Sequence, residues 1–378
     1  MSGKNHLSNE IVEGLSYNTP FFLFSKDKIK NNLNNFKKLF PGALINYAMK
    51  ANFEPDVLRV VADEGCGFEV ASKYELEFLK NIGVPADKII YGTSVKPASH
   101  IKDFFSYGVD RFAADSASEL EKIALVAPGA RVYIRVRVND AGSVFKFSEK
   151  FGTEIGNVIP LMTMARNLGL KTYGISFHVG SQAGNKMAWA NAIQDTSYCL
   201  EKLEELGISI DVLNLGGGFP CNNYLSSTGD FDLAEIAALT LESFNKLKVK
   251  PKIMLEPGRG IVADTGIAVA TVIARIERPT STWLFLDLGV YNGLFESMAY
   301  QGSTRYKITS LKPSGDSGEQ SFSLAGPTGD SPDVLTKEAF LPSDINVGDR
   351  LVIHDVGAYG LVATSRFNGF PAPDVYFV

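Results

Sequence analysis

The chain has 378 residues, of which 45% are hydrophobic and 21% are charged, and its formal net charge is -5. This length favours two domains, or one large barrel with an addition, and the composition is that of a soluble globular protein. The acidic balance, without any basic run, argues against nucleic acid and anionic membranes as partners, and no apolar stretch is long enough to span a bilayer.

The N-terminal stretch MSGKNHLSNEIVEG lacks the apolar core of a secretory signal. The three cysteines, Cys66, Cys199 and Cys221, are scattered and odd in number. This usage fits a reducing compartment, so we expect a cytoplasmic protein. Neither the cysteines nor the four histidines form a metal-ligand pattern, and we expect no metal site.

Strand-like and helical patterns alternate along the first two thirds of the chain. PFFLFS (20–25) predicts a strand, and KDKIKNNLNNFKKLF (26–40) predicts a helix. Eight later runs read as strands, and most are separated by amphipathic helical patterns: ALINYAMK (43–50), GCGFEVA (65–71), KIIYG (88–92), DRFAA (110–114), RVYIRVRV (131–138), YGISFHV (173–179), DVLNLG (211–216) and KIMLEP (252–257). Eightfold strand-helix alternation is typical of a (β/α)8 TIM barrel.

The pattern changes after about residue 265. The runs that follow read as strands without a long helical pattern between them: IAVATVIARIERPTSTWLFLDLGV (267–290), SFSLAG (321–326), DRLVIHD (349–355) and DVYFV (374–378). We therefore predict a barrel of residues 27–265 and an antiparallel β domain, sandwich-like or barrel-like, of residues 1–26 and 266–378.

Lys50 ends the first predicted barrel strand. The two-residue period of ALINYAMK places Leu44, Asn46, Ala48 and Lys50 on one face. The other face is bulkier and suits the side on which helices pack, so we expect Lys50 to point into the C-terminal mouth of the barrel. Barrel enzymes keep their chemistry at that end. The alternative is a lysine that merely reaches water at the end of a strand.

Other predicted strand ends carry residues with chemical potential: His178 and Ser181 in FHVGSQ, Gly216, Gly217 and Gly218 in LNLGGGFP, and Glu256 and Arg259 in LEPGRG. Each has a plain alternative, namely a structural histidine, a simple glycine turn, and a surface ion pair. Together, however, glycine N–H groups and an arginine suit a phosphate. A phosphate site that faces a lysine suggests pyridoxal 5'-phosphate, with Lys50 as its Schiff base.

At this point the sequence resembles the fold-type III pyridoxal-phosphate decarboxylases, that is, the ornithine/diaminopimelate decarboxylase family and especially its ornithine decarboxylase-like branch. The resemblance extends from PFFLFS to the C-terminus. The motifs that carry it are YAMKAN, FEVASKYEL, FHVGSQ, NLGGGFP, EPGRG, GVYNG, GPTGDSPD and GAYGLVATSRFNGF. It implies an alanine racemase-like barrel joined to a β domain.

The resemblance implies a cofactor site, residue by residue. Lys50 would form the aldimine, His178 would stack on the ring, and Glu256 would pair with the pyridine nitrogen. Ser181, the three glycines, Arg259 and Tyr359 would bind the phosphate. The remaining residues implied at the cofactor are Glu69, where many relatives have aspartate, and Glu75, Arg135 and Gly258.

The resemblance also implies residues at the substrate: Tyr291, Gln301, Gly329, Asp330 and Phe367, with Asp330 counted as catalytic. Relatives carry cysteine in place of Gly329 and aspartate in place of Gln301. These departures favour a diamino acid whose far end is acylated or carboxylated, as in secondary-metabolite pathways, beside ornithine or lysine as in polyamine synthesis. In the family two chains build each site, so we expect a head-to-tail homodimer in which GPTGDSPD reaches the partner.

Decarboxylation is the activity that the resemblance implies. Loss of carbon dioxide leaves a carbanion that a protonated ring absorbs as a quinonoid, and a carboxylate at Glu256 keeps the ring protonated. Racemases with a similar barrel have arginine at that position. The alternatives are an amino-acid racemase of the same fold and a non-catalytic, decarboxylase-like regulatory protein. Such regulators tend to lose the lysine or the phosphate ligands, which this chain keeps.

Overall fold

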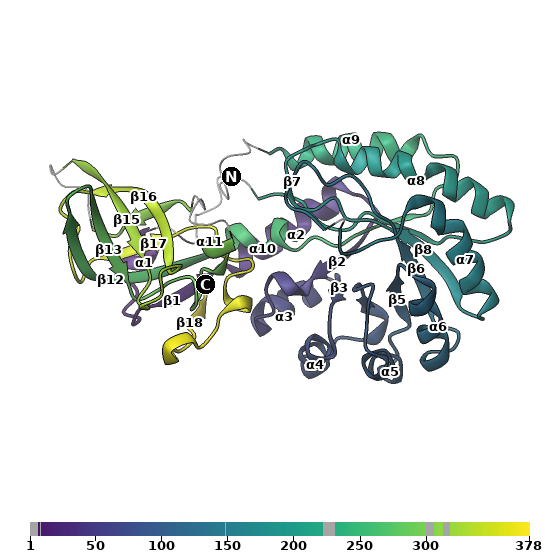
Figure 1. Ribbon diagram of the computed structural model, residues 1–378, viewed down its shortest axis with the longest axis horizontal. Coiled ribbons are helices and arrows are strands. Elements are labelled where there is room, and N and C mark those ends of the chain that lie inside the picture. The colour runs from purple at the N-terminus through teal and green to yellow at the C-terminus, as the bar shows by residue number, and fades with distance from the viewer. Residues whose placement is uncertain (1–6, 8, 148, 222–230, 300–305, 313–317) are drawn as a thin grey trace. The chain divides into compact units, whose positions relative to one another are not determined.

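The computed structural model describes residues 7, 9–147, 149–221, 231–299, 306–312 and 318–378. The chain divides into two compact units, whose helices and strands are labelled in Figure 1. The barrel unit comprises Lys30–Pro220 and Phe231–Gly260. The β unit includes Met1–Ile29 and Ile261–Val378.

A closed barrel of parallel strands forms the centre of the barrel unit. In order around the barrel, the strands found in the described part of the chain are β2 (Leu44–Ala48), β3 (Gly67–Val70), β4 (Ile89–Tyr91), β5 (Arg111–Ala114), β6 (Arg131–Arg135), β8 (Lys171–Ser176), β10 (Val212–Asn214) and β11 (Lys252–Leu255). β11 pairs with β2 and closes the ring. The eight predicted strands, and with them the TIM barrel, are confirmed.

Helices alternate with these strands and lie around the outside of the barrel (Figure 1). They are α2 (Lys26–Leu39), α3 (Pro55–Asp63), α4 (Lys73–Asn81), α5 (Ala98–Tyr107), α6 (Ala117–Val126), α7 (Val158–Asn167), α8 (Ala188–Glu205) and α9 (Leu233–Asn245). The short α10 (Arg259–Val262) follows β11. Ser72 and Ser116 begin α4 and α6, because their side chains accept hydrogen bonds from N–H groups of the first turn. Within the described residues, no helix has the length and apolar character needed to cross a membrane.

The interior of the barrel is filled by side chains from seven of its strands: Leu44, Ile90, Ala113, Tyr133, Tyr173, Val212 and Met254. Leu44 is the residue that the alternation of β2 predicts to point inward. Tyr47, on the opposite face of β2, packs edge-on against Phe68 with ring centroids 6.5 Å apart. The two faces of β2 are therefore oriented as predicted, which directs the end of this strand toward the mouth of the barrel.

A small two-stranded sheet was not predicted. β7 (Ser143–Phe145) follows β6, and β9 (Ser181–Ala183) follows β8, and the two pair antiparallel. Strands of three residues leave almost no periodic signal in a sequence. The sheet ties together two loops at the carboxyl end of the barrel.

The β unit is built on a mostly antiparallel sheet. Its strands in the described residues are β1 (Phe21–Phe24), β12 (Gly266–Arg278), β13 (Ser281–Leu286), β14 (Ile308–Ser310), β15 (Glu319–Ala325), β16 (Val334–Pro342), β17 (Arg350–Ile353) and β18 (Asp374–Phe377). Two pairs are parallel, β1 with β18 and β13 with β15, so the predicted antiparallel arrangement holds for most of the sheet. The unit also contains the short helices α1 (Asn9–Glu13) and α11 (Phe295–Ala299).

β1 is buried on both of its faces. Phe22 and Phe24 belong to one apolar cluster of the β unit, while Phe21 and Leu23 belong to another. All four side chains are 0% exposed. A strand that is covered on both sides reads as a continuous apolar run, which is why PFFLFS was recognisable.

Candidate active site

Lys50 lies in a short 3-10 turn, Met49–Ala51, directly after β2. The predicted strand is therefore two residues shorter at this end. The Nζ atom of Lys50 lies 3.0 Å from Oε2 of Glu69, the carboxylate of β3, and the two side chains are 41% and 3% exposed. A carboxylate this buried requires a cation or several donors. Lys50 thus has a fixed partner at the barrel mouth and does not merely reach water.

The loops after β8 and β10 lie side by side at the same end of the barrel. The N–H of Phe177 donates to the carbonyl of Asn214 at 3.0 Å, and the N–H of Ala183 donates to the carbonyl of Gly218 at 3.0 Å. His178 lies between these two contacts. Ser181, which is 7% exposed, belongs to the same loop. The predicted histidine, serine and glycines are therefore brought together.

The glycine run is a sharp turn that side chains would block. Gly216 and Gly218 have φ values of 66° and 91°, in the left-handed region. A Cβ on Gly216 would lie 2.2 Å from the carbonyl oxygen of Phe177, and one on Gly218 would lie 2.2 Å from that of Gly180. Among the described residues, no acceptor faces the N–H groups of Gly217 and Gly218. Such a turn offers two backbone donors to an anion.

Glu256 follows β11 and faces the glycine turn. Its N–H donates to the carbonyl of Gly216 at 2.7 Å, and its Oε1 accepts from Nδ2 of Asn214 at 2.6 Å. Burial, and then the charge of Glu69, raise the pKa of Glu256 to about 7, against the opposing effect of Lys50. A cation placed beside Glu256 would therefore stabilise its ionised form.

The segment that carries Arg259 lies against the turn of Lys50. The N–H of Ala48 donates to the carbonyl of Pro257 at 3.0 Å, and a Cβ on Gly258 would lie 3.0 Å from Cβ of Ala51. Arg259 itself is 4% exposed. This burial excludes the surface ion pair that the sequence left open, and it places a guanidinium among the strand ends.

His178 is a neutral imidazole with a defined tautomer. Its Nδ1 accepts the N–H of Gly180 at 3.0 Å, so the ring proton is on Nε2. Burial, followed by the positive charges of Arg135 and Lys50, lowers the pKa of His178 well below its usual range. Phe147 meets the ring edge-on, with centroids 5.0 Å apart. His178 therefore offers a flat face and an Nε2–H donor, without a charge.

Two more predicted residues belong to the barrel unit. The guanidinium carbon of Arg135 lies 5.1 Å from the ring centroid of Phe151, and burial lowers the pKa of Arg135. Glu75 accepts the N–H of Ala71 at 2.6 Å, and burial raises its pKa to about 7, with a smaller contribution from Glu69. The phenylalanine contacts of His178 and Arg135 were not predicted.

The predicted substrate residues belong to the β unit. Tyr291 donates a hydrogen bond to Oδ2 of Asp330, and its ring stacks on Phe367 with centroids 4.4 Å apart. Gly329 is exposed, and a Cβ built on it would meet no heavy atom within 4 Å. Tyr359 also lies in this unit and adopts a left-handed φ of 56°. Gln301 lies outside the described residues.

Asp333 is a positioning residue that the sequence did not reveal. Its carboxylate is 2% exposed and accepts the N–H of Val290 at 2.9 Å, the N–H of Thr328 at 3.0 Å and Oγ1 of Thr328 at 2.6 Å. It fastens the GPTGDSPD loop to the turn that bears Tyr291 and so holds Asp330 beside that tyrosine. Asn214 was missed in the same way. Only the final aspartate of a motif and an asparagine before a glycine run signalled them.

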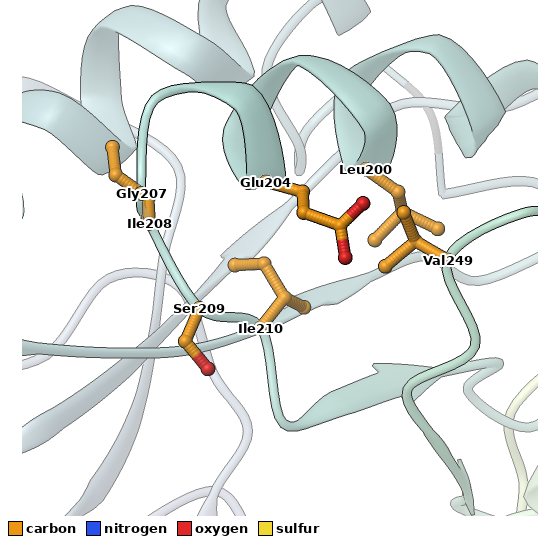
Figure 2. Close-up of a pocket in the computed structure, with 7 residues that line it drawn as sticks. All are labelled: Leu200, Glu204, Gly207, Ile208, Ser209, Ile210 and Val249. Atoms are coloured by element: carbon orange, nitrogen blue, oxygen red, sulfur yellow. The ribbon is translucent and has the colours of Figure 1, made fainter.

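A pocket of about 310 Å³ lies elsewhere on the barrel unit (Figure 2). Its lining residues are Leu200, Glu204, Gly207, Ile208, Ser209, Ile210 and Val249. The loops involved lead into β10 and β11, so the pocket lies at the amino ends of these strands, while Lys50 lies at a carboxyl end. Figure 2 shows the Glu204 carboxylate pointing into the pocket. The pocket is therefore separate from the candidate site.

The donor set at the barrel mouth fits pyridoxal phosphate. The glycine turn leaves room and N–H groups for a phosphate, and Arg259 adds a buried cation. Lys50 supplies an amine within the same set of strand ends. Glu256, whose pKa is raised to about 7, suits a ring nitrogen that gains a proton.

Comparison with known proteins agrees with this geometry. Residues 26–263 match the family model described as "Pyridoxal-dependent decarboxylase, pyridoxal binding domain". The lysine/ornithine decarboxylase of Selenomonas ruminantium is 33% identical over 360 residues, covering 95% of this chain and 90% of that protein. Antizyme inhibitor 2 of Xenopus laevis is 32% identical, covering 98% and 83%. The crystal structure of the Paramecium bursaria Chlorella virus arginine decarboxylase bound to agmatine superimposes with a TM-score of 0.90 at 26% identity, covering 98% and 99%.

The chain combines a TIM barrel with a β unit, and the mouth of the barrel carries a lysine, a glycine turn and a carboxylate. These features define a fold-type III pyridoxal-phosphate enzyme. The chain belongs to the family of pyridoxal-dependent decarboxylases, in the branch of the ornithine decarboxylases. It is accordingly a carboxy-lyase that acts on an amino acid, and its cofactor is pyridoxal 5'-phosphate.

Proposed function

We propose that this enzyme removes the α-carboxyl group of a basic amino acid, or of a diamino acid with a substituted far end, as carbon dioxide. The observation that carries the proposal is the ion pair between Lys50 and Glu69, 3.0 Å long, at the end of the barrel where the glycine turn lies. The relatives that are named for lysine, ornithine and arginine support a basic substrate.

In this proposal Lys50 is the covalent anchor and a carrier of protons. When bound, pyridoxal phosphate would supply an aldehyde for the substrate amine and an electron-withdrawing ring for the electron pair that departing carbon dioxide leaves behind. Lys50 would hold the cofactor through Nζ, a primary amine that can condense with an aldehyde by loss of water and can be replaced there by a substrate amine. Glu69 keeps Nζ directed into the mouth of the barrel because its carboxylate is buried and cannot follow the lysine outward.

The other barrel residues bind and tune the ring. Ser181, the three glycines, Gly258 and Arg259 hold the phosphate. The Glu256 carboxylate would accept a hydrogen bond from the protonated ring nitrogen, which keeps its proton, and this ion pair would stabilise the charged ring that decarboxylation requires. The neutral His178 would present its flat face to the ring, and its Nε2–H is a hydrogen-bond donor that adds no charge. Arg135 balances the two carboxylates Glu69 and Glu256.

The substrate side of the site is assigned to the β unit. Asp330 is proposed to bind the far amine of the substrate or to act in catalysis, with Tyr291 and Phe367 beside it. The open space at Gly329 supports a substrate with a bulkier far end than ornithine. Gln301 and Tyr359 remain proposed as a substrate contact and a phosphate ligand.

We also propose a head-to-tail homodimer in which Asp330 of one chain serves the barrel of the other. Its test mixes Lys50→Ala with Asp330→Ala after partial unfolding and reassociation, and measures the rate at a substrate concentration far below KM, where the loss of the Asp330 carboxylate lowers the rate most. Shared sites restore up to about a quarter of wild-type activity in the mixture, because half of the dimers are mixed and each mixed dimer regains one of its two sites. A mixture as inactive as its components contradicts shared sites.

The domain boundaries and the compartment stand as proposals as well. A cofactor-binding barrel of residues 27–265 and a β domain of residues 1–26 and 266–378 are supported by the match of the family model to residues 26–263. A cytoplasmic location is supported by the buried thiols of Cys66 and Cys199, which are free.

The decisive experiment measures carbon dioxide release from a panel of L- and D-amino acids, including diamino acids acylated or carboxylated at the far end. We expect one basic or substituted diamino acid to be turned over, with a visible cofactor absorption band that Lys50→Ala removes. Loss of chirality without gas release would indicate a racemase. A colourless protein that releases no gas would place the chain with regulators such as antizyme inhibitor 2.

A further inference from the structure

Gly92 lies next to the Lys50–Glu69 pair, in the residue that follows β4. Its N–H donates to the carbonyl of Val70 at 3.1 Å and so extends the pairing of β4 with β3, the strand of Glu69. A Cβ built on Gly92 would lie 2.3 Å from Oε1, 2.6 Å from Cγ and 2.8 Å from Cδ of Glu69. The side chain of Glu69 therefore occupies the space that any other residue at position 92 would fill.

The backbone itself does not require glycine at this position. Gly92 is absent from the glycines with positive φ, so an L-residue can adopt its conformation. The three nearest heavy atoms to the added Cβ all belong to one side chain, that of Glu69. An added methyl group at position 92 would therefore meet Glu69 before any other residue.

The carboxylate of Glu69 lies between Lys50 and Gly92. Oε2 contacts Nζ of Lys50 at 3.0 Å, while Oε1 lies over Gly92. The side chain is 3% exposed, so a carboxylate that is pushed away finds little water to replace the lysine. Displacement by a methyl group consequently separates the carboxylate from Lys50.

We propose that Gly92 is a positioning residue of the active site: its missing side chain lets Glu69 lie across β4 and hold the ammonium of Lys50. The long side chain of Glu69 thus packs over a residue that has no side chain. The proposal rests on the proposed function, because it is the reactivity of Lys50 that Gly92 and Glu69 control.

The test measures the amine of Lys50 in the cofactor-free protein. Peptide mass spectrometry follows acetylation of Lys50 by acetic anhydride at pH 8, relative to the exposed Lys171. A carboxylate at 3.0 Å favours the protonated, unreactive amine. Gly92→Ala is expected to raise the relative rate about three- to tenfold, as Glu69→Ala does, and the double variant is expected to match Glu69→Ala alone. This readout requires no turnover, so a failed activity assay and a failed coupling are distinguishable.

Gly156→Ala is the matched control, because Gly156 belongs to the same unit, has no positive φ and has no heavy atom within 4 Å of its added Cβ. It is expected to leave the rate at Lys50 unchanged. An unchanged rate in Gly92→Ala, or an equal further rise when Gly92→Ala is added to Glu69→Ala, overturns the proposal. If Gly92→Ala does not fold, adding Glu69→Ala must restore folding, and failure to do so also overturns it.

Discussion

The polar residues at the barrel mouth differ in exposure and in hydrogen-bond partners from those around Asp330 in the β unit, which we call the Asp330 turn. At the barrel mouth, the side chain or backbone of each key residue has a defined partner: Glu69 with Lys50, Glu256 with Asn214, and His178 with Gly180. In the β unit, Asp330 and Tyr291 hold each other above a stacked Phe367 that is 42% exposed, and Gly329 borders open space.

The difference indicates which of the two regions is committed to one chemistry. At the barrel mouth, fixed partners hold the polar groups where a cofactor needs them. A substitution that moves one of these groups is therefore expected to lower the rate of the reaction strongly. An exposed turn, by contrast, tolerates substitution as long as its anchor remains. We therefore expect changes at the mouth to affect kcat strongly, and changes in the turn to affect mainly KM or nothing.

The strongest test of this comparison is Lys50→Ala, with Lys50→Arg as its partner. Both remove the nucleophilic amine, but arginine keeps a cation beside Glu69, so folding is preserved. We expect each variant to lose on the order of 10³-fold or more in kcat, measured by carbon dioxide release. If Lys50→Arg retained a tenth of the activity, the role of Lys50 would be that of a charge alone.

The second test is Glu256→Gln, which keeps an acceptor for Asn214 but removes the charge. The ring nitrogen then loses its ion partner, and we expect kcat to fall by about 10²-fold while cofactor remains bound. Asn214→Ala leaves the charge of Glu256 in place and removes only the hydrogen bond that orients its carboxylate. We therefore expect kcat of this variant to fall about tenfold, which corresponds to about 1.4 kcal/mol. Equal losses in the two variants would show that orientation, not charge, is what Glu256 provides.

A third test moves to the β unit with Asp330→Asn. The amide keeps the shape and the contact with Tyr291 but removes the charge that we propose binds a basic substrate. We expect KM to rise about tenfold, or about 1.4 kcal/mol, with cofactor content unchanged. Should kcat fall as strongly as in Glu256→Gln with KM unaltered, Asp330 acts in the chemical step and the contrast between the two regions narrows.

A fourth test uses pH and the stability of the cofactor-free protein. The pKa of Glu75 is raised from 4.5 to about 7 in the folded state, so the folded state binds more protons than the unfolded state between these values. Stability from this group is full below pH 4.5 and is lost as the pH rises through 7. Urea unfolding therefore measures the free energy of unfolding at pH 5 and at pH 8. Its decrease between these two pH values should be smaller in Glu75→Gln than in the wild type by about 2 kcal/mol.

Glu77→Gln is the control for this measurement. Glu77 lies in the same helix, α4, and its side chain is 58% exposed. It should follow the wild-type pH dependence. A Glu75→Gln profile parallel to that of the wild type would mean that Glu75 is charged throughout this range.

The smallest expected effect is that of Gly329→Ala. Its added Cβ meets nothing within 4 Å, and its φ is not positive, so the free energy of unfolding should change by less than about 0.5 kcal/mol. Gly326→Ala is the contrasting variant in the same loop, because its Cβ would lie 2.2 Å from Oδ1 of Asp333. That variant should lose about 1–3 kcal/mol. Equal stability of the two would contradict the anchoring role of Asp333.

The barrel was predictable because its strands are apolar runs between amphipathic helices. The ends of these runs also revealed Lys50 and Glu256. β16, by contrast, lies at the end of the sheet order, and the run Thr336–Lys337–Glu338 within it hides the strand pattern.

The sequence predicted which residues carry the chemistry, but it did not predict which residues hold them in place. Asn214, Asp333 and Gly92 act through contacts with residues that lie 42, 43 and 23 positions away. No local pattern records such contacts, because they exist only once the strands are assembled. The neutral tautomer of His178 likewise depends on a backbone N–H two residues further on, whose direction the sequence does not specify.

The pairing of β1 has a consequence for how the chain is made. Phe21 pairs with Val269 of β12 and with Asp374 of β18, so this strand meets its neighbours only after most of the polypeptide has been synthesised. The strands of the barrel pair mainly with the next barrel strand in sequence, so the barrel can assemble before the four apolar side chains of β1 are buried. During that interval β1 is an exposed apolar segment that is prone to aggregation.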